Sequence, residues 1–207
     1  IAKNIRYTLA KMSFDVYDKR NENKELYKKI SSDLTATYQM KNIIGVLQAV
    51  EILPQMGFEK VNQKSIFSAL KNVRLLTNFI GRWQILSTQK PFIIADSSHN
   101  SAGLKVAMQQ FSSYDFENLH IVLGFVKGKE DSNLWEILPK NAIYYFCCAN
   151  IPRALPTDIL VKKAMQYNLH FKVFVSVKKA FETAKKYAKP NDMIYIGGSI
   201  YVVAEII

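Results

Sequence analysis

The sequence contains little cysteine, and its two cysteines do not form a common metal or redox motif. Cys147 and Cys148 are neighbours in an apolar run, and the chain has no Cys-x-x-Cys. Neighbouring residues of a strand point to opposite faces of a sheet, so the two thiols are poorly placed to share a metal ion. This usage is typical of buried, reduced thiols in a cytosolic protein. We expect a cytoplasmic protein without a cysteine metal site.

Long apolar runs are also absent. No stretch approaches the roughly 18 residues of a membrane helix, which disfavours a membrane partner. The segment from Ile1 to Arg6 lacks the apolar core of a signal peptide, and the chain has no initiator methionine. We therefore expect it to begin inside a larger gene product. Its 207 residues, 49% of them hydrophobic, suffice for one domain and a piece of another.

Acidic residues are in the minority, and the formal net charge is +11. A basic balance suits anionic partners such as nucleotides and polycarboxylates. The cations are spread evenly, since residues 1–82 hold 14 of the 28 lysines and arginines. No dense basic run with interleaved aromatics occurs, which argues against nucleic-acid binding.

The first third of the chain gives a mixed pattern followed by a helical one. The segment Ile5 to Leu9 is compatible with a strand, and the polar segment Asp18 to Lys29 is typical of a surface loop or an exposed helix. We expect helices from Tyr38 to Leu53, stopping at Gly57, and from Gln63 to Lys71. The apolar face of the first helix, at i, i+3, i+4, i+7 and i+10, consists of Ile43, Val46, Leu47, Val50 and Leu53.

We place a domain boundary in the irregular segment between Asn72 and Gly81, which divides the chain into residues 1–80 and 81–207. After Gly81, short apolar runs alternate with helical patterns. The expected strands are Trp83–Leu86, Phe92–Asp96, His120–Leu123, Ile143–Cys148, Lys172–Val175 and Met193–Gly197. The expected helices are Ala102–Phe111, Asn133–Leu138, Thr157–Tyr167 with Thr157 as its N-cap, Val177–Ala188 and one from Ile200 onward. This alternation predicts an α/β fold with a mostly parallel sheet flanked by helices.

Polar and glycine residues follow four of these strands. Ligands of open parallel sheets bind beyond the carboxyl ends of the strands, so these four loops form the expected site. They are residues 97–100, 124–130, 149–153 and 197–199, and they contain an imidazole, several cations and a Gly-Gly turn. Simpler roles are open as well: Asp96 could cap the next helix, His99 could be a surface residue, and Gly197-Gly198 could be only a tight turn.

The segment Gly124-x-x-x-Gly128-Lys129-Glu130 is not a phosphate-binding loop. Such a loop has four residues between its glycines and a serine or threonine after the lysine, whereas here there are three and a glutamate follows. No strand is followed by Gly-x-Gly-x-x-Gly, which disfavours a dinucleotide-dependent oxidoreductase.

Taken in order, several short motifs resemble those of the folylpolyglutamate synthase/dihydrofolate synthase family of the Mur ligase superfamily. The resemblance runs from about Leu34 to the C-terminus, and its strongest part is Asp-x-x-His-Asn following Gly-Arg. The motifs are Leu34-Thr35-Ala36-Thr37-Tyr38-Gln39-x-x-Asn42, Gly81-Arg82-Trp83-Gln84, Asp96-x-x-His99-Asn100, Gly124 with Lys129, Pro152-Arg153-Ala154 and Asp192 to Ser199.

The resemblance implies that residues 81–207 are the C-terminal glutamate-ligase domain and residues 1–80 a helical tail of a central P-loop ATPase domain. It implies that ATP binds between those two domains. The helix Tyr38–Leu53 would then turn its apolar face toward the missing part of the P-loop domain, and residues 1–80 would pack poorly alone.

The resemblance also implies a role for each motif residue. Asn42 would approach the adenine, Arg82 the ATP phosphates and Asp96 the ribose. His99 and Ser199 would hold the incoming glutamate, and His99 and Lys129 would be catalytic. These residue types suit the roles, because arginine offers a permanent cationic donor fork and an ionised carboxylate accepts hydroxyl donors.

The implied chemistry is an ATP-dependent ligation in which a carboxylate of dihydropteroate or of a folate becomes an acyl phosphate and is attacked by the amine of L-glutamate. Mg²⁺ is expected, with its ligands in the missing N-terminal part, and the enzyme is expected to be a monomer. The sequence departs from the family pattern at Gly128, where the family has an aspartate. An alternative is therefore a catalytically degenerate nucleotide- or folate-binding module.

Overall fold

The computed structural model describes residues 1–128 and 132–207, and the chain divides into two compact units, Ile1–Ile80 and Gly81–Ile207. Lys129 and Glu130, in the predicted loop 124–130, lie outside the described residues. In the part of the chain that the structure covers, no helix has the length and apolarity needed to traverse a membrane.

The first unit opens with a three-stranded antiparallel sheet, β1 (Ala2–Tyr7), β2 (Met12–Tyr17) and β3 (Glu25–Ser32), in that spatial order. The interpretation of residues 18–29 as a loop or helix was therefore wrong from Glu25 onward. In β3 only Ile30 and Ser32 are buried. So few buried apolar positions give little alternation, which explains why the sequence did not reveal the strand.

Helices complete this unit. They are α1 (Gln39–Val50), the 3₁₀ turn η1 (Leu53–Met56), α2 (Gln63–Lys71) and α3 (Val73–Thr77). The bounds of α2 agree with the prediction, and Asn62 caps it by accepting the N–H of Ser65 at 3.1 Å. The short helix α3 lies in the segment that was expected to be irregular.

The unit has a hydrophobic core of its own, formed by the sheet, α1 and α2. From α1, Ile43 and Leu47 are each only 2% exposed and pack in this core, whereas Val46 is 47% exposed. The expectation that the apolar face of α1 turns wholly to a missing domain was therefore wrong for Ile43 and Leu47, because the unpredicted sheet covers them. The core residues are Met12, Phe14, Val16, Ile30, Met40, Ile43, Leu47 and Leu70.

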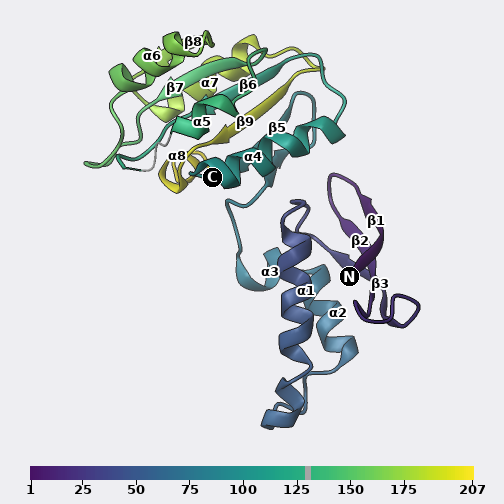
Figure 1. The fold of residues 1–207 in the computed structure, drawn as a ribbon. Coiled ribbons are helices and arrows are strands. Elements are labelled where there is room, and N and C mark those ends of the chain that lie inside the picture. Colours follow the sequence, from purple (N-terminus) through teal and green to yellow (C-terminus); the bar gives the residue numbers. More distant parts are fainter. Residues whose placement is uncertain (129–131) are drawn as a thin grey trace. The chain divides into compact units, whose positions relative to one another are not determined.

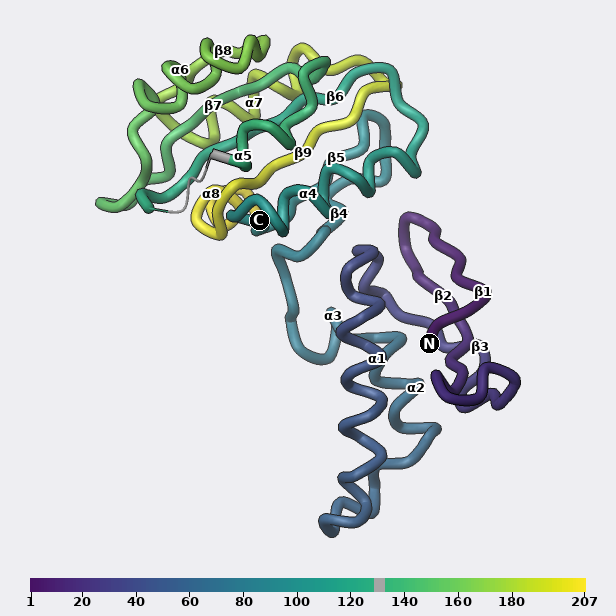
Figure 2. Tube along the Cα trace, viewed as in Figure 1, coloured from purple at the N-terminus to yellow at the C-terminus, as the bar shows by residue number. Residues whose placement is uncertain are grey.

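The second unit contains a six-stranded sheet in the order β4-β5-β9-β6-β7-β8 with helices on both faces (Figure 1). Only β4 is antiparallel to its neighbour, so the prediction of a mostly parallel α/β fold is confirmed. Figure 2 shows the late strand β9 running between β5 and β6. The strands are β4 (Gln84–Ser87), β5 (Phe92–Asp96), β6 (Leu119–Leu123), β7 (Ile143–Cys147), β8 (His170–Phe174) and β9 (Met193–Gly197).

The helices of this unit cover opposite faces of the sheet. They are α4 (Ser101–Gln110), the 3₁₀ turn η2 (Phe111–Ser113), α5 (Ser132–Glu136), α6 (Thr157–Gln166), α7 (Val177–Tyr187) and α8 (Ile200–Ala204). Residues of α7 and α8 share one core cluster with the sheet. On the other face, Phe111 packs edge-on against Tyr195, and Trp135 packs at a tilt against Phe146. The N-cap of α6 is Pro156 rather than the predicted Thr157.

Candidate functional site

Four loops meet at the carboxyl edge of the parallel sheet. Asp96, the last residue of β5, is level with Gly197 of β9, and Gly197 is level with Leu123 of β6. Leu123 is in turn level with Phe146 of β7. Because these strands end together, the loops that follow them lie side by side, as the sequence predicts.

The Gly197-Gly198 turn brings the β9 and β6 loops into direct contact. Gly198 has a φ of +88°, and a Cβ on it would lie 2.6 Å from the carbonyl oxygen of Gly124. The Gly124 N–H donates to the Gly197 carbonyl at 3.3 Å. A side chain at position 198 would thus meet both a left-handed backbone and a backbone oxygen, so glycine is required there.

Ser199 follows this turn and is the N-cap of α8. Its Oγ accepts the N–H of Val202 at 3.1 Å, and the residue is 2% exposed. The hydroxyl proton can still be donated, because the cap uses Ser199 only as an acceptor. Ser199 therefore has one defined structural role at the place where the sequence predicts a glutamate contact.

Asp96 lies inside the site rather than on its surface. Its side chain is fully buried, and its two carboxylate oxygens accept backbone N–H groups, from Trp83 at 2.7 Å and from Ser98 at 2.8 Å. The charge is thus stabilised by amides of the turn before β4 and of the loop after β5. This arrangement ties the Arg82 turn to the His99 loop.

Arg82 lies in a turn whose flanking residues both have positive φ, +72° for Gly81 and +44° for Trp83. The Gly81 carbonyl accepts the N–H of Ser97 at 2.8 Å. Arg82 itself is half-buried, between these two anchored neighbours. The turn therefore holds an arginine at the same edge of the sheet as Asp96.

His99 and Asn100 shape the loop between β5 and α4. The half-buried His99 ring has its Nδ1 3.1 Å from the carbonyl oxygen of Ser97. Asn100 caps α4 by accepting the N–H of Gly103 at 2.8 Å. If Nδ1 carries the proton in this contact, Nε2 is left as an acceptor. The carboxyl edge of the six-stranded sheet therefore carries four of the predicted site residues, which are Arg82, Asp96, His99 and Ser199.

The loops after β6 and β7 hold each other. The N–H of Lys127 donates to the carbonyl of Arg153 at 2.9 Å, and the N–H of Leu155 donates to that of Phe125 at 2.8 Å. The Arg153 guanidinium donates to the Tyr201 hydroxyl at 2.9 Å and lies 5.2 Å from the centre of its ring. Lys127, whose side chain is exposed, is thus a cation of the β6 loop that lies among the described residues.

Asn42 belongs to the other unit, Ile1–Ile80. It lies on the exposed side of α1, and its Nδ2 donates to Gln39 Oε1 at 2.8 Å. It borders an open apolar pocket of about 310 Å³ lined mainly by residues of α1, α2 and α3. The side chains around the pocket include Leu34, Val46, Leu70, Val73 and Leu76.

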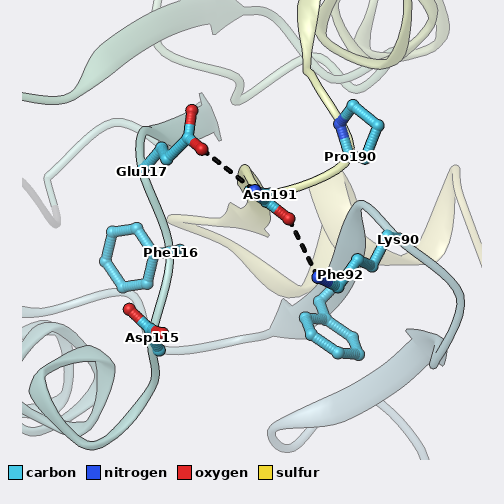
Figure 3. Close-up of a pocket in the computed structure, with 7 residues that line it drawn as sticks. All are labelled: Lys90, Phe92, Asp115, Phe116, Glu117, Pro190 and Asn191. Atoms are coloured by element: carbon cyan, nitrogen blue, oxygen red, sulfur yellow. Dashed lines mark hydrogen bonds between the residues drawn. The ribbon is translucent and has the colours of Figure 1, made fainter.

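Another pocket lies at the amino edge of the six-stranded sheet, and Figure 3 shows the residues that line it. Lys90 Nζ donates to Asn191 Oδ1 at 2.8 Å, and Asn191 Nδ2 donates to Glu117 Oε1 at 3.0 Å. Lys90, Asn191 and Glu117 therefore bind one another and join the segments that precede β5, β6 and β9. We interpret this pocket as a structural junction rather than a ligand site.

Next to this junction is a buried polar network that the sequence did not reveal. His120 contacts the Asp192 carboxylate at 3.1 Å and the Tyr145 hydroxyl at 2.9 Å. Burial opposes ionisation of Asp192, but hydrogen bonds from the Lys189 N–H, from Asn118 and from His120 outweigh it and hold the pKa of the carboxyl below its ordinary value. The network stabilises the amino ends of β6, β7 and β9.

Metal binding has no candidate in residues 1–128 and 132–207, which contain no group of three or more histidine, cysteine or acidic side chains placed to hold an ion. We therefore derive no metal-dependent step from these residues.

Two aromatic residues beside the Arg82 turn were not predicted to belong to the site. The Trp83 Nε1–H donates to the Tyr114 hydroxyl at 3.2 Å. Trp83 follows Arg82 directly, so its place in the motif was the available signal.

Comparison with known proteins decides the family. Residues 81–200 match the family model described as "Mur ligase, glutamate ligase domain". The chain belongs to this family. The match covers the unit that carries Arg82, Asp96, His99 and Ser199, and the prediction of a Mur ligase C-terminal domain is confirmed.

Curated relatives of this Mur ligase domain are folate enzymes. A probable bifunctional folylpolyglutamate synthase/dihydropteroate synthase of Haloferax volcanii is 27% identical over 174 residues, which cover 83% of this chain and 20% of the relative. A dihydrofolate synthase/folylpolyglutamate synthase of Buchnera aphidicola is 26% identical over 148 residues, which cover 70% of this chain and 34% of the relative. The chain thus spans a fifth to a third of these relatives.

Solved structures share the fold. A Mycobacterium tuberculosis folylpolyglutamate synthase complexed with ADP has a TM-score of 0.76 at 19% identity, with 98% of this chain and 45% of that chain covered. The E. coli FolC complex with ADP has a TM-score of 0.60 at 22% identity and covers 70% of this chain and 34% of that one. The similarity to the Mycobacterium tuberculosis enzyme therefore includes both units of this chain.

Proposed function

We propose that this chain is the C-terminal part of an ATP-dependent ligase that joins L-glutamate to dihydropteroate or to a folate. The observation that carries the proposal is the match of residues 81–200 to the glutamate ligase domain, with Arg82, Asp96, His99 and Ser199 on one sheet edge. The names of the curated relatives supply the folate substrate class. Residues 1–80 would be the end of the central ATP-binding domain.

Arg82 is the residue that we propose for the ATP phosphates. Its guanidinium stays charged and offers parallel donors that match phosphate oxygens. Asn42 would meet the adenine, and the apolar pocket beside it is of a kind that suits a flat, weakly polar ring. Neighbouring structures in complex with ADP and AMPPNP support a nucleotide site in this family.

The ribose contact implied for Asp96 stays a prediction. It requires the carboxylate to become accessible to a hydroxyl donor, whereas in this structure the side chain is fully buried and accepts two backbone N–H groups.

His99 and Ser199 are proposed to hold the glutamate, and His99 and Lys129 to act on the reaction. A hydroxyl and an imidazole can donate to a carboxylate or accept from an ammonium group, the two charged ends of an amino acid. In the reaction, a folate carboxylate attacks the terminal phosphorus of ATP and ADP leaves. The glutamate amine then attacks the acyl carbon, loses a proton, and inorganic phosphate departs.

The proposed reaction also requires Mg²⁺, which would bind outside this chain. A divalent ion would neutralise phosphate charge, as in other phosphoryl transfers. One structural neighbour is complexed with AMPPNP and a manganese ion. The protein ligands of Mg²⁺ would lie in the part of the enzyme that corresponds to the segment of the relatives not covered by this chain. The other residues that bind the ATP phosphates would lie there too.

The proposal is tested on the natural protein that contains this chain. Arg82→Ala should raise KM for ATP by about 10- to 100-fold, since it removes a charge-assisted contact. His99→Ala should raise KM for glutamate more than KM for ATP. The assay is ADP release that depends on both folate and glutamate. Nucleotide or folate binding without any glutamate-dependent turnover would instead indicate the non-enzymatic module.

A further inference from the structure

Trp83 combines a large buried side chain with a left-handed backbone. Its φ is +44° and its side chain is fully buried. A bulky residue rarely adopts this region, because its Cβ crowds the neighbouring carbonyl. Glycine would adopt the same backbone freely but would have no side chain to fix it. A tryptophan at this position therefore has an unfavourable backbone conformation, but its buried side chain holds the turn in place.

The indole is held from the α4 side of the sheet. Its ring centre lies 5.0 Å from that of Phe111 and 6.2 Å from that of Tyr114. Its Nε1–H donates to the Tyr114 hydroxyl at 3.2 Å. Both rings pack at a tilt against the buried indole, with interplanar angles of 48° for Phe111 and 35° for Tyr114. These contacts limit movement of the indole, and the hydrogen bond fixes its rotation. The Trp83 side chain thus has one defined position.

The backbone on both sides of Arg82 is held by the end of β5. The Trp83 N–H donates to Asp96 Oδ2 at 2.7 Å, and the Gly81 carbonyl accepts the Ser97 N–H at 2.8 Å. Asp96 Oδ1 accepts the Ser98 N–H, directly before His99. The residues before and after Arg82 are therefore bound to the same short segment.

We propose that Trp83 is a positioning residue for Arg82. Its indole, locked by Phe111 and Tyr114, and its N–H, held by Asp96, fix the turn that presents the guanidinium at the carboxyl edge of the sheet. This inference rests on the proposed role of Arg82 at the ATP phosphates. Positioning of this kind matters because a displacement of about 1 Å at a reacting group can cost about 100-fold in rate.

The test uses three variants of the natural full-length protein in the ADP-release assay. Trp83→Phe keeps an aromatic anchor but removes the Nε1–H, and Tyr114→Phe removes only the hydroxyl that receives it. Trp135→Phe is the matched control, because Trp135 is a buried tryptophan of α5 that packs on Phe125 and Phe146. Arg82→Ala is measured alongside.

We expect Trp83→Phe and Tyr114→Phe to raise KM for ATP about 3- to 10-fold, less than Arg82→Ala, with KM for glutamate unchanged. Trp135→Phe should lower Tm without changing KM for ATP, which separates positioning from loss of stability. If Arg82→Ala raises KM for ATP and both Trp83→Phe and Tyr114→Phe match Trp135→Phe, the positioning role is wrong and the proposed function stands. If Arg82→Ala itself leaves KM for ATP unchanged, the proposed role of Arg82 and this inference both fall.

Discussion

Gly198 lies so close to Gly124 that a Cβ on Gly198 would be 2.6 Å from the Gly124 carbonyl oxygen. This contact joins the β9 loop to the β6 loop at the candidate site, and it leaves no space for a side chain. The close approach therefore explains the glycine at position 198, whereas a Cβ on Gly197 would meet the Tyr195 side chain.

Gly198→Ala should therefore destabilise the second unit by about 2 to 4 kcal/mol, through left-handed strain and the clash together. Gly128→Ala is the control, since Gly128 has a φ of +76° and, among residues 1–128 and 132–207, no atom within 4 Å of its Cβ position. It should cost only about 1 kcal/mol. Urea denaturation followed by circular dichroism measures both, and equal losses would mean that the Gly124 contact contributes nothing.

Leu47→Ala should destabilise the first unit by about 2 to 4 kcal/mol, because Leu47 is buried between α1 and the antiparallel sheet. Val46→Ala is the neighbour that should change stability by less than about 0.5 kcal/mol, since Val46 is half exposed. Thermal unfolding of the 207-residue chain distinguishes them. Similar effects of the two substitutions would show that α1 has no inward face in this unit.

Asp192→Asn should lower the free energy of unfolding by about 2 kcal/mol at pH 7. The pKa of Asp192 is lowered in the folded chain, so its contribution is present above the unfolded value of about 4 and is lost as the pH falls through the folded value. The difference between wild type and variant should thus shrink below about pH 4.

Asp115→Asn is the control for this pH dependence, because Asp115 is an exposed carboxylate of the same unit. Because this side chain lies at the surface, its replacement should change the free energy of unfolding little. The stability gap of Asp192→Asn should be clear at pH 7 and small at about pH 3. A stability gap for Asp192→Asn that persists undiminished at low pH would argue against the role of its charge.

The two cysteines should react with thiol reagents at different rates. Burial raises the pKa of both thiols, but Cys147 is fully buried whereas Cys148 is only partly so. Because the thiolate is the reactive form and must also be reached, Cys148 should be alkylated slowly at pH 8 and Cys147 only after unfolding. Mass spectrometry of the labelled peptides would show the order, and prior labelling of Cys147 would contradict it.

Much of the second unit could be predicted from the sequence, because its inner strands β5, β6, β7 and β9 are largely buried and form continuous apolar runs. The bounds of β5 and β9 agree with the expected ones, and the four loops meet at one edge. Most of the sheet of the first unit could not be predicted, since β1 and most of β3 face solvent and carry few apolar residues. The strand expected at Ile5–Leu9 overlaps β1 only from Ile5 to Tyr7.

The inward position of Asp96 could not be predicted either. An aspartate at the end of a strand suits a ligand contact and a backbone contact equally, and only the three-dimensional position of the Trp83 N–H distinguishes them. The apolar face of α1 was expected to pack on a missing domain for a different reason. The sheet that covers Ile43 and Leu47 has only a weak pattern in the sequence.

The most direct test of the proposed function is the transfer of labelled L-glutamate to a folate by the natural protein that contains this chain. With ATP and Mg²⁺ we expect a product heavier by one glutamyl residue, formed together with ADP, and no such product from the 207-residue chain alone. Loss of the product with Arg82→Ala would support the site. Glutamate transfer by the 207-residue chain alone, or no transfer by the natural protein with either dihydropteroate or folate, would contradict the account.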